Sequence, residues 1–217
     1  RGLGDVYKRQ DTFIYDMTTA PWWNNGEKIE YTNLADMAVE GMNAGSPQVY
    51  APAFTNYVEG IYVGYKYYET AAQEGFIDYD KTVQYPFGYG LSYTEFEQKM
   101  GELEEKDGQI SVDVEVTNTG DVAGKDVVEV YYNPPYTNGG IEKASANLIE
   151  FAKTDLLQPG DSQTVTVTFD VEDMASYDEN DAEAYVLEKG DYVISINRDS
   201  HTVLDQKTYT VDDTVVY

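Results

Sequence analysis

Carboxylates and aromatic rings are the side chains in this sequence that could do chemistry. The 217 residues include 40 Asp and Glu, 21 Tyr, 7 Phe and 2 Trp, with one histidine and no cysteine. The single His201 argues against a histidine-based triad or a multi-histidine metal site, and the lack of cysteine excludes thiol chemistry and disulfides. Carboxylates are plentiful, but their number alone selects no catalytic pair.

The two tryptophans are adjacent, at Trp22 and Trp23, in the turn-rich stretch PWWNNG (residues 21–26). Adjacent tryptophans on a loop could stack on a sugar ring, because an indole presents a large flat surface with a polar edge. The commoner alternative is burial against the parent domain. Trp22 and Trp23 are therefore candidates for a weak sugar contact.

Glu59 is a carboxylate singled out by its position. It lies near the start of residues 57–73, where aromatic and apolar residues repeat at helical spacing, and Gly75 follows as a stop signal. The repeating residues are Tyr57, Ile61, Tyr65 and Tyr68. The pattern predicts a helix whose N-terminal dipole Glu59 stabilises. The alternative is that Glu59 supports the substrate pocket of a complete enzyme.

An aromatic and glycine-rich stretch, YPFGYGLSYTEF (residues 85–96), divides the chain into two parts, and we call it the hinge. Pro86 fixes one backbone φ angle, while Gly88 and Gly90 permit positive φ or a close approach of the backbone. The tyrosines and phenylalanines of the hinge supply large surfaces that pack at a junction. We expect the hinge to connect an N-terminal unit of helices and loops to a C-terminal unit of strands.

Short strand patterns follow the hinge at regular intervals. In residues 110–116, the apolar Ile110, Val112, Val114 and Val116 alternate with polar residues and therefore share one face. Further strands are expected at residues 127–132, 146–152, 164–169, 184–188, 192–196 and 208–211. Seven short strands over about 100 residues are typical of an immunoglobulin-like β-sandwich.

The connections carry their own signals. The charged residues 97–108 are expected to form a loop, residues 158–161 (QPGD) a type II turn, and residues 189–191 the turn of a hairpin. Ahead of the hinge, residues 11–15 predict a strand and residues 33–42 a short helix.

The formal net charge of −26 argues against binding to nucleic acid or to anionic membranes. We expect an acidic, well-solvated surface. No apolar run approaches the length of about 20 residues that a membrane helix needs. The acidic run DEND (residues 178–181) lacks the ligand spacing of an EF-hand loop, so an exposed turn is expected there, and no metal or cofactor is expected.

Two motifs in order, EGIYVGYKYY (residues 59–68) and PFGYGLSY (residues 86–93), closely resemble those of the family-3 glycoside hydrolases, the β-glucosidases and their relatives. The strand region is similar to the fibronectin type III-like domain of the same enzymes. Its matching stretches are NTGDVAG (118–124), EVY (129–131), LLQPGDS (156–162) and GDY (190–192). The resemblance covers roughly residues 11–217.

The resemblance implies a mostly β fold. A fibronectin type III-like, immunoglobulin-type β-sandwich over residues 92–217 would follow an incomplete α/β segment over residues 11–91, the C-terminal remnant of the family's α/β sandwich domain. Residues 1–10 (RGLGDVYKRQ) look like a translated sequencing-adapter scar, and we expect them to be non-native and exclude them from the fold prediction. The alternative is an ordinary basic N-terminal tail. If so, the chain has been cut upstream.

The resemblance also implies that the parent protein is a retaining β-glucosidase-type enzyme acting on β-linked oligosaccharides. The family takes a nucleophilic Asp from a (β/α)₈ barrel and an acid/base Glu from the α/β sandwich, and no segment here matches either motif, so no catalytic residue is assigned. The alternative is a non-catalytic carbohydrate-binding or spacer module. In some members the barrel comes last, an order that residues 74–80 favour, and residues 211–217 would then lead into a linker.

A bacterial cytoplasmic location is slightly favoured over secretion.

Overall fold

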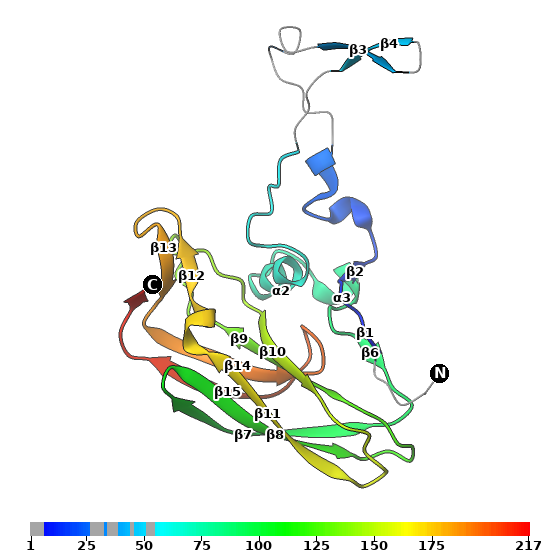
Figure 1. The fold of residues 1–217 in the computed structure, drawn as a ribbon, viewed down its shortest axis with the longest axis vertical. Helices are drawn as coiled ribbons and strands as arrows, with labels where there is room; N and C mark the ends of the chain where they lie inside the picture. The colour runs from blue at the N-terminus through cyan, green and yellow to red at the C-terminus, as the bar shows by residue number, and fades with distance from the viewer. Residues whose placement is uncertain (1–6, 27–32, 34–38, 44–45, 51–54) are drawn as a thin grey trace. The chain divides into compact units, whose positions relative to one another are not determined.

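The computed structural model describes residues 7–26, 33, 39–43, 46–50 and 55–217 (Figure 1). It contains two compact units. One combines Arg1–Tyr15 with Ile61–Tyr217, and the other is Asp16–Gly60.

A two-sheet sandwich makes up most of the larger unit (Figure 1). One antiparallel sheet has the order β11-β8-β7, and the other has the order β10-β9-β14-β15. Their strands are β7 (Phe96–Lys106), β8 (Gln109–Asn118), β9 (Val127–Asn133), β10 (Asn147–Lys153), β11 (Ser162–Asp170), β14 (Gly190–Asn197) and β15 (Val203–Val211). These seven strands in two sheets confirm the predicted β-sandwich.

The core of the sandwich lies between the two sheets. The predicted alternation in β8 holds, because Ile110, Val112, Val114 and Val116 are all fully buried. Ile194 of β14 and other apolar residues of the second sheet belong to the same cluster. Strand β9 is buried on both faces, so its polar face is covered by another part of the chain.

Two predicted connections are wrong. Residues 97–108 do not form a loop, because most of them belong to β7, whose charged side chains face solvent while Met100 enters the core. Residues 189–191 do not close a hairpin, since β13 (Ala184–Leu187) pairs with β12 (Ser176–Asp178) and β16 (Val215–Val216). Strand β14 pairs instead with β9 and β15.

The turn at residues 158–161 has the predicted type II features. The Asp161 N–H donates to the Gln158 carbonyl at 2.9 Å, and Gly160 takes a φ of +83°. The acidic residues 178–181 also form an exposed turn as predicted. There the Asp178 carboxylate accepts hydrogen bonds from the backbone N–H groups of Asn180, Asp181 and Ala182.

The helix predicted from residue 57 begins only at α2 (Tyr65–Gln73). Gly60 and Gly64 take φ angles of +55° and +60°, which a right-handed helix cannot include, so residues 57–64 are wrong as helix. Glu59 therefore lies in a turn and does not stabilise a helix dipole. The short α3 (Tyr79–Thr82) follows, capped by the Asp78 side chain.

Small antiparallel pairs complete the larger unit. Strand β2 (Phe13–Ile14), within the predicted strand, pairs with β5 (Val83–Tyr85). Strand β1 (Tyr7–Lys8) pairs with β6 (Gly90–Leu91) in the hinge. Tyr7 and Lys8 of the opening segment thus pair within the larger unit, while the non-native origin of residues 1–10 stays a prediction.

In the smaller unit, Asp16–Gly60, the described residues form the 3-10 turns Met17–Thr19 and Trp23–Gly26 and a hairpin. The hairpin joins β3 (Val39–Asn43) to β4 (Ser46–Tyr50). Residues 34–38 of the predicted helix lie outside the described residues. The helix is wrong for residues 39–42, where pairing with β4 satisfies the backbone instead.

Candidate functional site

The adjacent tryptophans are accessible. Trp22 and Trp23 are 42% and 47% exposed, and their ring centroids lie 6.3 Å apart with the planes tilted by 49°. A 3-10 turn begins at Trp23, and Trp22 directly precedes it, so both rings belong to one tight loop. The pair therefore offers open aromatic surface of the kind that stacks on a flat apolar ligand face.

Glu59 joins the tryptophan loop through one hydrogen bond. The Asn25 side-chain amide donates to Glu59 Oε2 at 2.7 Å, and Asn25 is buried. Asn25 also donates its backbone N–H to the Trp22 carbonyl at 3.0 Å. The structure thus brings Trp22, Trp23 and Glu59 into one small cluster, and Asn25, which sequence reasoning treated only as a turn residue, connects them.

The hinge lies against the outer face of the sandwich. The Phe87 ring stacks on Tyr65 of α2, with centroids 4.7 Å apart, and Tyr65 meets the edge of Tyr131 on β9 at 6.1 Å. The Phe87 carbonyl accepts a hydrogen bond of 2.8 Å from the Ser200 N–H, in the connection between β14 and β15. This packing covers the polar face of β9 and explains why that strand is buried on both sides.

A buried carboxylate, Glu69 of α2, ties both helices to the sandwich. Glu69 Oε1 accepts hydrogen bonds from the Tyr79 hydroxyl at 2.6 Å and the Ser200 hydroxyl at 2.7 Å. Glu69 Oε2 lies 2.8 Å from His201 Nδ1, and the His201 ring stacks on Tyr79 with centroids 3.6 Å apart. The hydrogen bond to Glu69 raises the pKa of His201. His201 is a packing residue here.

A second buried carboxylate, Glu129, lies on the outer face of β9. Its Oε2 accepts a hydrogen bond of 3.0 Å from the Tyr131 hydroxyl, and its Oε1 lies 3.4 Å from Lys8 Nζ. Burial outweighs these two partners and raises the pKa of Glu129 to about 7.

The stability of the larger unit should therefore fall as pH rises through this window. The carboxyl of Glu129 binds its proton more tightly in the folded state, where its pKa is about 7 against an ordinary value of 4.5. The folded state thus holds more protons than the unfolded chain between these values, and the free energy of unfolding should drop by about 2 kcal/mol from about pH 5 to about pH 7. Urea unfolding across this range measures the drop.

The Glu129→Gln variant is the matched test, because an amide keeps an acceptor for the Tyr131 hydroxyl and cannot ionise. This variant should flatten the pH dependence between pH 5 and 7. An unchanged slope would contradict the assignment of the slope to Glu129.

Two cavities flank α2. One has a volume of about 610 Å³ and lies between the helix and the outer face of the β9-β14-β15 sheet, beside the Glu69 cluster. The other has a volume of about 520 Å³ and is lined by α2 and the connection between β9 and β10. Both fall in the size range of small-molecule sites.

In the part of the chain that the structure describes, no three His, Asp or Glu side chains gather in a way that could hold a metal ion. In that same part, no helix has the length and apolar character needed to cross a membrane. The buried carboxylates Glu69 and Glu129 both accept hydrogen bonds from neighbouring side chains, so their observed role is to hold the hinge, α2 and the sandwich together.

Known proteins match nearly the full length of this chain. A sequence profile of the fibronectin type III-like domain matches residues 126–200. A β-glucosidase of Ruminococcus albus is 38% identical over 221 residues, which cover 99% of this chain and 20% of that protein. Beta-glucosidase A of Butyrivibrio fibrisolvens is 42% identical over 159 residues, which cover 64% of this chain and 18% of that protein.

Solved structures agree with these relatives. A β-glucosidase from Paenibacillus barengoltzii matches 98% of this chain and 21% of its own with a TM-score of 0.75 and 33% identity. Beta-glucosidase 3B from Thermotoga neapolitana, in complex with α-D-glucose, matches 95% of this chain and 24% of its own with a TM-score of 0.73 and 31% identity. The chain spans about a fifth of the length of the curated relatives it matches.

Proposed function

Since this chain is a segment of the family-3 β-glucosidase type that contains a fibronectin type III-like domain, we propose that it supports the catalytic domains of a larger enzyme. That enzyme would be a retaining β-glucosidase hydrolysing terminal β-glycosidic bonds of oligosaccharides. The segment itself would supply no catalytic carboxylate.

The observation that carries the support role is the docking of α2 on the sandwich. The Leu148 N–H donates to the Tyr65 hydroxyl at 2.9 Å, and the Ser145 N–H donates to Thr70 Oγ1 at 3.0 Å. Together with the Glu69 cluster, these bonds fix one face of the helix against the sandwich. A helix held in this way is a rigid base for the α/β segment to which it belongs.

The chemistry of the reaction argues against activity in this segment alone. Retaining hydrolysis needs two carboxyl groups about 5–5.5 Å apart, one nucleophilic and one able to donate a proton. Among the described residues, the buried carboxylates Glu69, Glu129 and Asp199 all accept hydrogen bonds within the fold, and Glu59 bonds to Asn25. We therefore assign the nucleophile and the acid to parts of the enzyme outside this sequence.

The experiment that tests this proposal is hydrolysis of aryl β-glucosides and aryl β-xylosides by the purified 217-residue chain, beside a sample without protein. We expect no turnover. Turnover that persists through repurification would overturn the non-catalytic role, and a Glu59→Gln variant would then show whether the carboxylate near the tryptophans acts in it.

A second candidate function, sugar binding by the smaller unit, has a specific observation in its favour. Trp22 and Trp23 are both exposed, and Asn25 orders their loop through Glu59. On this hypothesis the chain should be retained by immobilised β-linked oligosaccharide, and the Trp22→Ala variant should lose about tenfold in affinity, or about 1.4 kcal/mol.

The matched control for that experiment is Tyr177→Ala, which removes an exposed aromatic ring from strand β12 of the larger unit. Equal retention of the wild type and both variants would argue against a tryptophan-dependent sugar site.

A further inference from the structure

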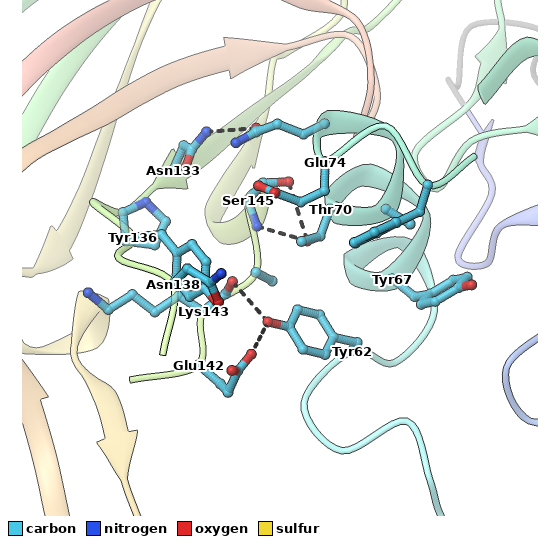
Figure 2. Close-up of a pocket in the computed structure, with 15 residues that line it drawn as sticks. Tyr62, Tyr67, Thr70, Glu74, Asn133, Tyr136, Asn138, Glu142, Lys143 and Ser145 are labelled. Carbon is cyan, nitrogen blue, oxygen red and sulfur yellow. Dashed lines mark hydrogen bonds between the residues drawn. The ribbon is translucent and has the colours of Figure 1, made fainter. Parts of the chain in front are cut away.

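The smaller of the two cavities beside α2 has well-defined walls (Figure 2). One wall is the segment from Tyr62 through α2 to Phe76, and the other is the connection from Asn133 to Ser145. Its volume of about 520 Å³ suits a ligand of one or two ring units.

The walls are held together by direct bonds between them. Thr70 Oγ1 accepts from the Ser145 N–H at 3.0 Å, and Gln73 Oε1 accepts from the Asn133 side-chain amide at 3.2 Å. The Tyr62 hydroxyl donates to the Glu142 carboxylate, as Figure 2 shows. The cavity is thus formed before any ligand arrives, which lowers the ordering cost of binding.

The charges around the cavity disfavour an anionic ligand. Its one cation, Lys143, has a side chain that is only 2% exposed, donates to the Pro135 carbonyl at 2.7 Å and pairs with Glu188. The two acidic residues of the lining, Glu74 and Glu142, are exposed. A phosphate or carboxylate group would therefore meet negative charge and a cation that is already neutralised.

The remaining lining combines aromatic faces with polar groups. Tyr62 and Tyr136 supply rings, and Asn138 and Glu74 supply amide and carboxylate groups. Within the described residues, the side chains of Asn138 and Glu74 are exposed and make no hydrogen bond, so both can take ligand hydroxyls. Rings that cover the apolar face of a ligand and amide or carboxylate groups that bind its hydroxyls match a neutral saccharide.

We propose that this cavity, between α2 and the β9–β10 connection, binds one or two units of a neutral saccharide without cleaving it. The choice of β-linked glucose units as the ligand rests on the proposed function. The presence of a saccharide site does not rest on the proposed function, because the site is argued from the lining residues alone.

The test is calorimetric titration of the 217-residue chain with cellobiose. We expect saturable binding that weakens at least tenfold in Tyr136→Ala and several-fold in Asn138→Ala. Both residues lie on an exposed connection, Tyr136 being 41% exposed, so the sandwich should stay folded, as the circular dichroism spectrum can verify. Tyr93→Ala, which removes a 72% exposed ring outside the cavity, is the control and should bind normally.

Three outcomes would overturn the proposal. The first is that cellobiose does not bind. The second is that cellobiose binds, but Tyr136→Ala and Asn138→Ala leave its affinity unchanged while Trp22→Ala abolishes binding. The third is that inorganic phosphate binds at this cavity in place of the sugar. Failure of the proposed function has a different signature, namely turnover of aryl glycosides by the same preparation. The two ideas can therefore fail separately.

Discussion

Replacing Gly88 with alanine is expected to lower the free energy of unfolding of the larger unit by about 3 kcal/mol. Gly88 has a φ of +82°, and a methyl group there would lie 2.6 Å from Glu129 Oε2 and 3.1 Å from Asp199 Cα. The Glu129 carboxylate and the Asp199 backbone are both held by the sandwich, so neither can move aside without cost. The hinge would have to lift away from β9.

The matched control is Gly108→Ala, in the turn between β7 and β8. Gly108 has nearly the same φ, +81°, but a methyl group there would meet nothing within 4 Å. This variant should lower the free energy of unfolding by about 1 kcal/mol, because it adds backbone strain and no clash. Urea unfolding measures both variants, and equal losses would mean that the close approach of the hinge to Glu129 contributes nothing.

Replacing Glu69 with alanine is expected to lower the free energy of unfolding by about 3 kcal/mol, because three donors then lose a buried acceptor. These donors are the hydroxyls of Tyr79 and Ser200 and the ring of His201. The Glu69→Gln variant keeps a neutral acceptor and should cost about half as much. Equal stability of Glu69→Ala and the wild type in urea unfolding would contradict a role for Glu69 in docking α2.

The same cluster adds a second pH effect. Because Glu69 raises the pKa of His201 above its ordinary 6.5, the folded state holds this proton more tightly than the unfolded chain does. The stabilisation is fully present below pH 6.5 and is lost as pH rises through the raised pKa of His201. Glu69→Ala should remove this loss, while Glu129→Gln should leave it in place, so the two carboxylates can be separated by their pH windows.

Local pattern was enough to predict much of the sandwich. Period-2 alternation placed Ile110, Val112, Val114 and Val116 in the core, and proline and glycine at residues 158–161 marked the turn. These features depend on neighbours in sequence. The hinge was predicted to join two units, but the two compact units divide at residues 15/16 and 60/61, so the hinge lies inside the larger unit.

The features that sequence reasoning missed depend on distant partners. The many charged residues of strand β7 masked its strand pattern, since its inward face adds only Met100 to the buried core, with Phe96 and Leu103 packed against it. The role of Glu69 depends on Ser200 and His201, which lie 131 and 132 positions away in sequence. The accessibility of Trp22 and Trp23 could not be read from their types, because tryptophan pairs occur both buried and exposed.

In the connection between β14 and β15, Ser200 donates hydrogen bonds to both the Phe87 carbonyl and the Glu69 carboxylate. Both bonds join residues that are more than 100 positions apart in the sequence. Contacts that span more than 100 positions carry a large loop-closure cost, so they form late in folding. The sandwich strands, joined mainly to near neighbours, should collapse first. Substitutions at Gly88 and Glu69 are then expected to speed unfolding and to leave the refolding rate nearly unchanged.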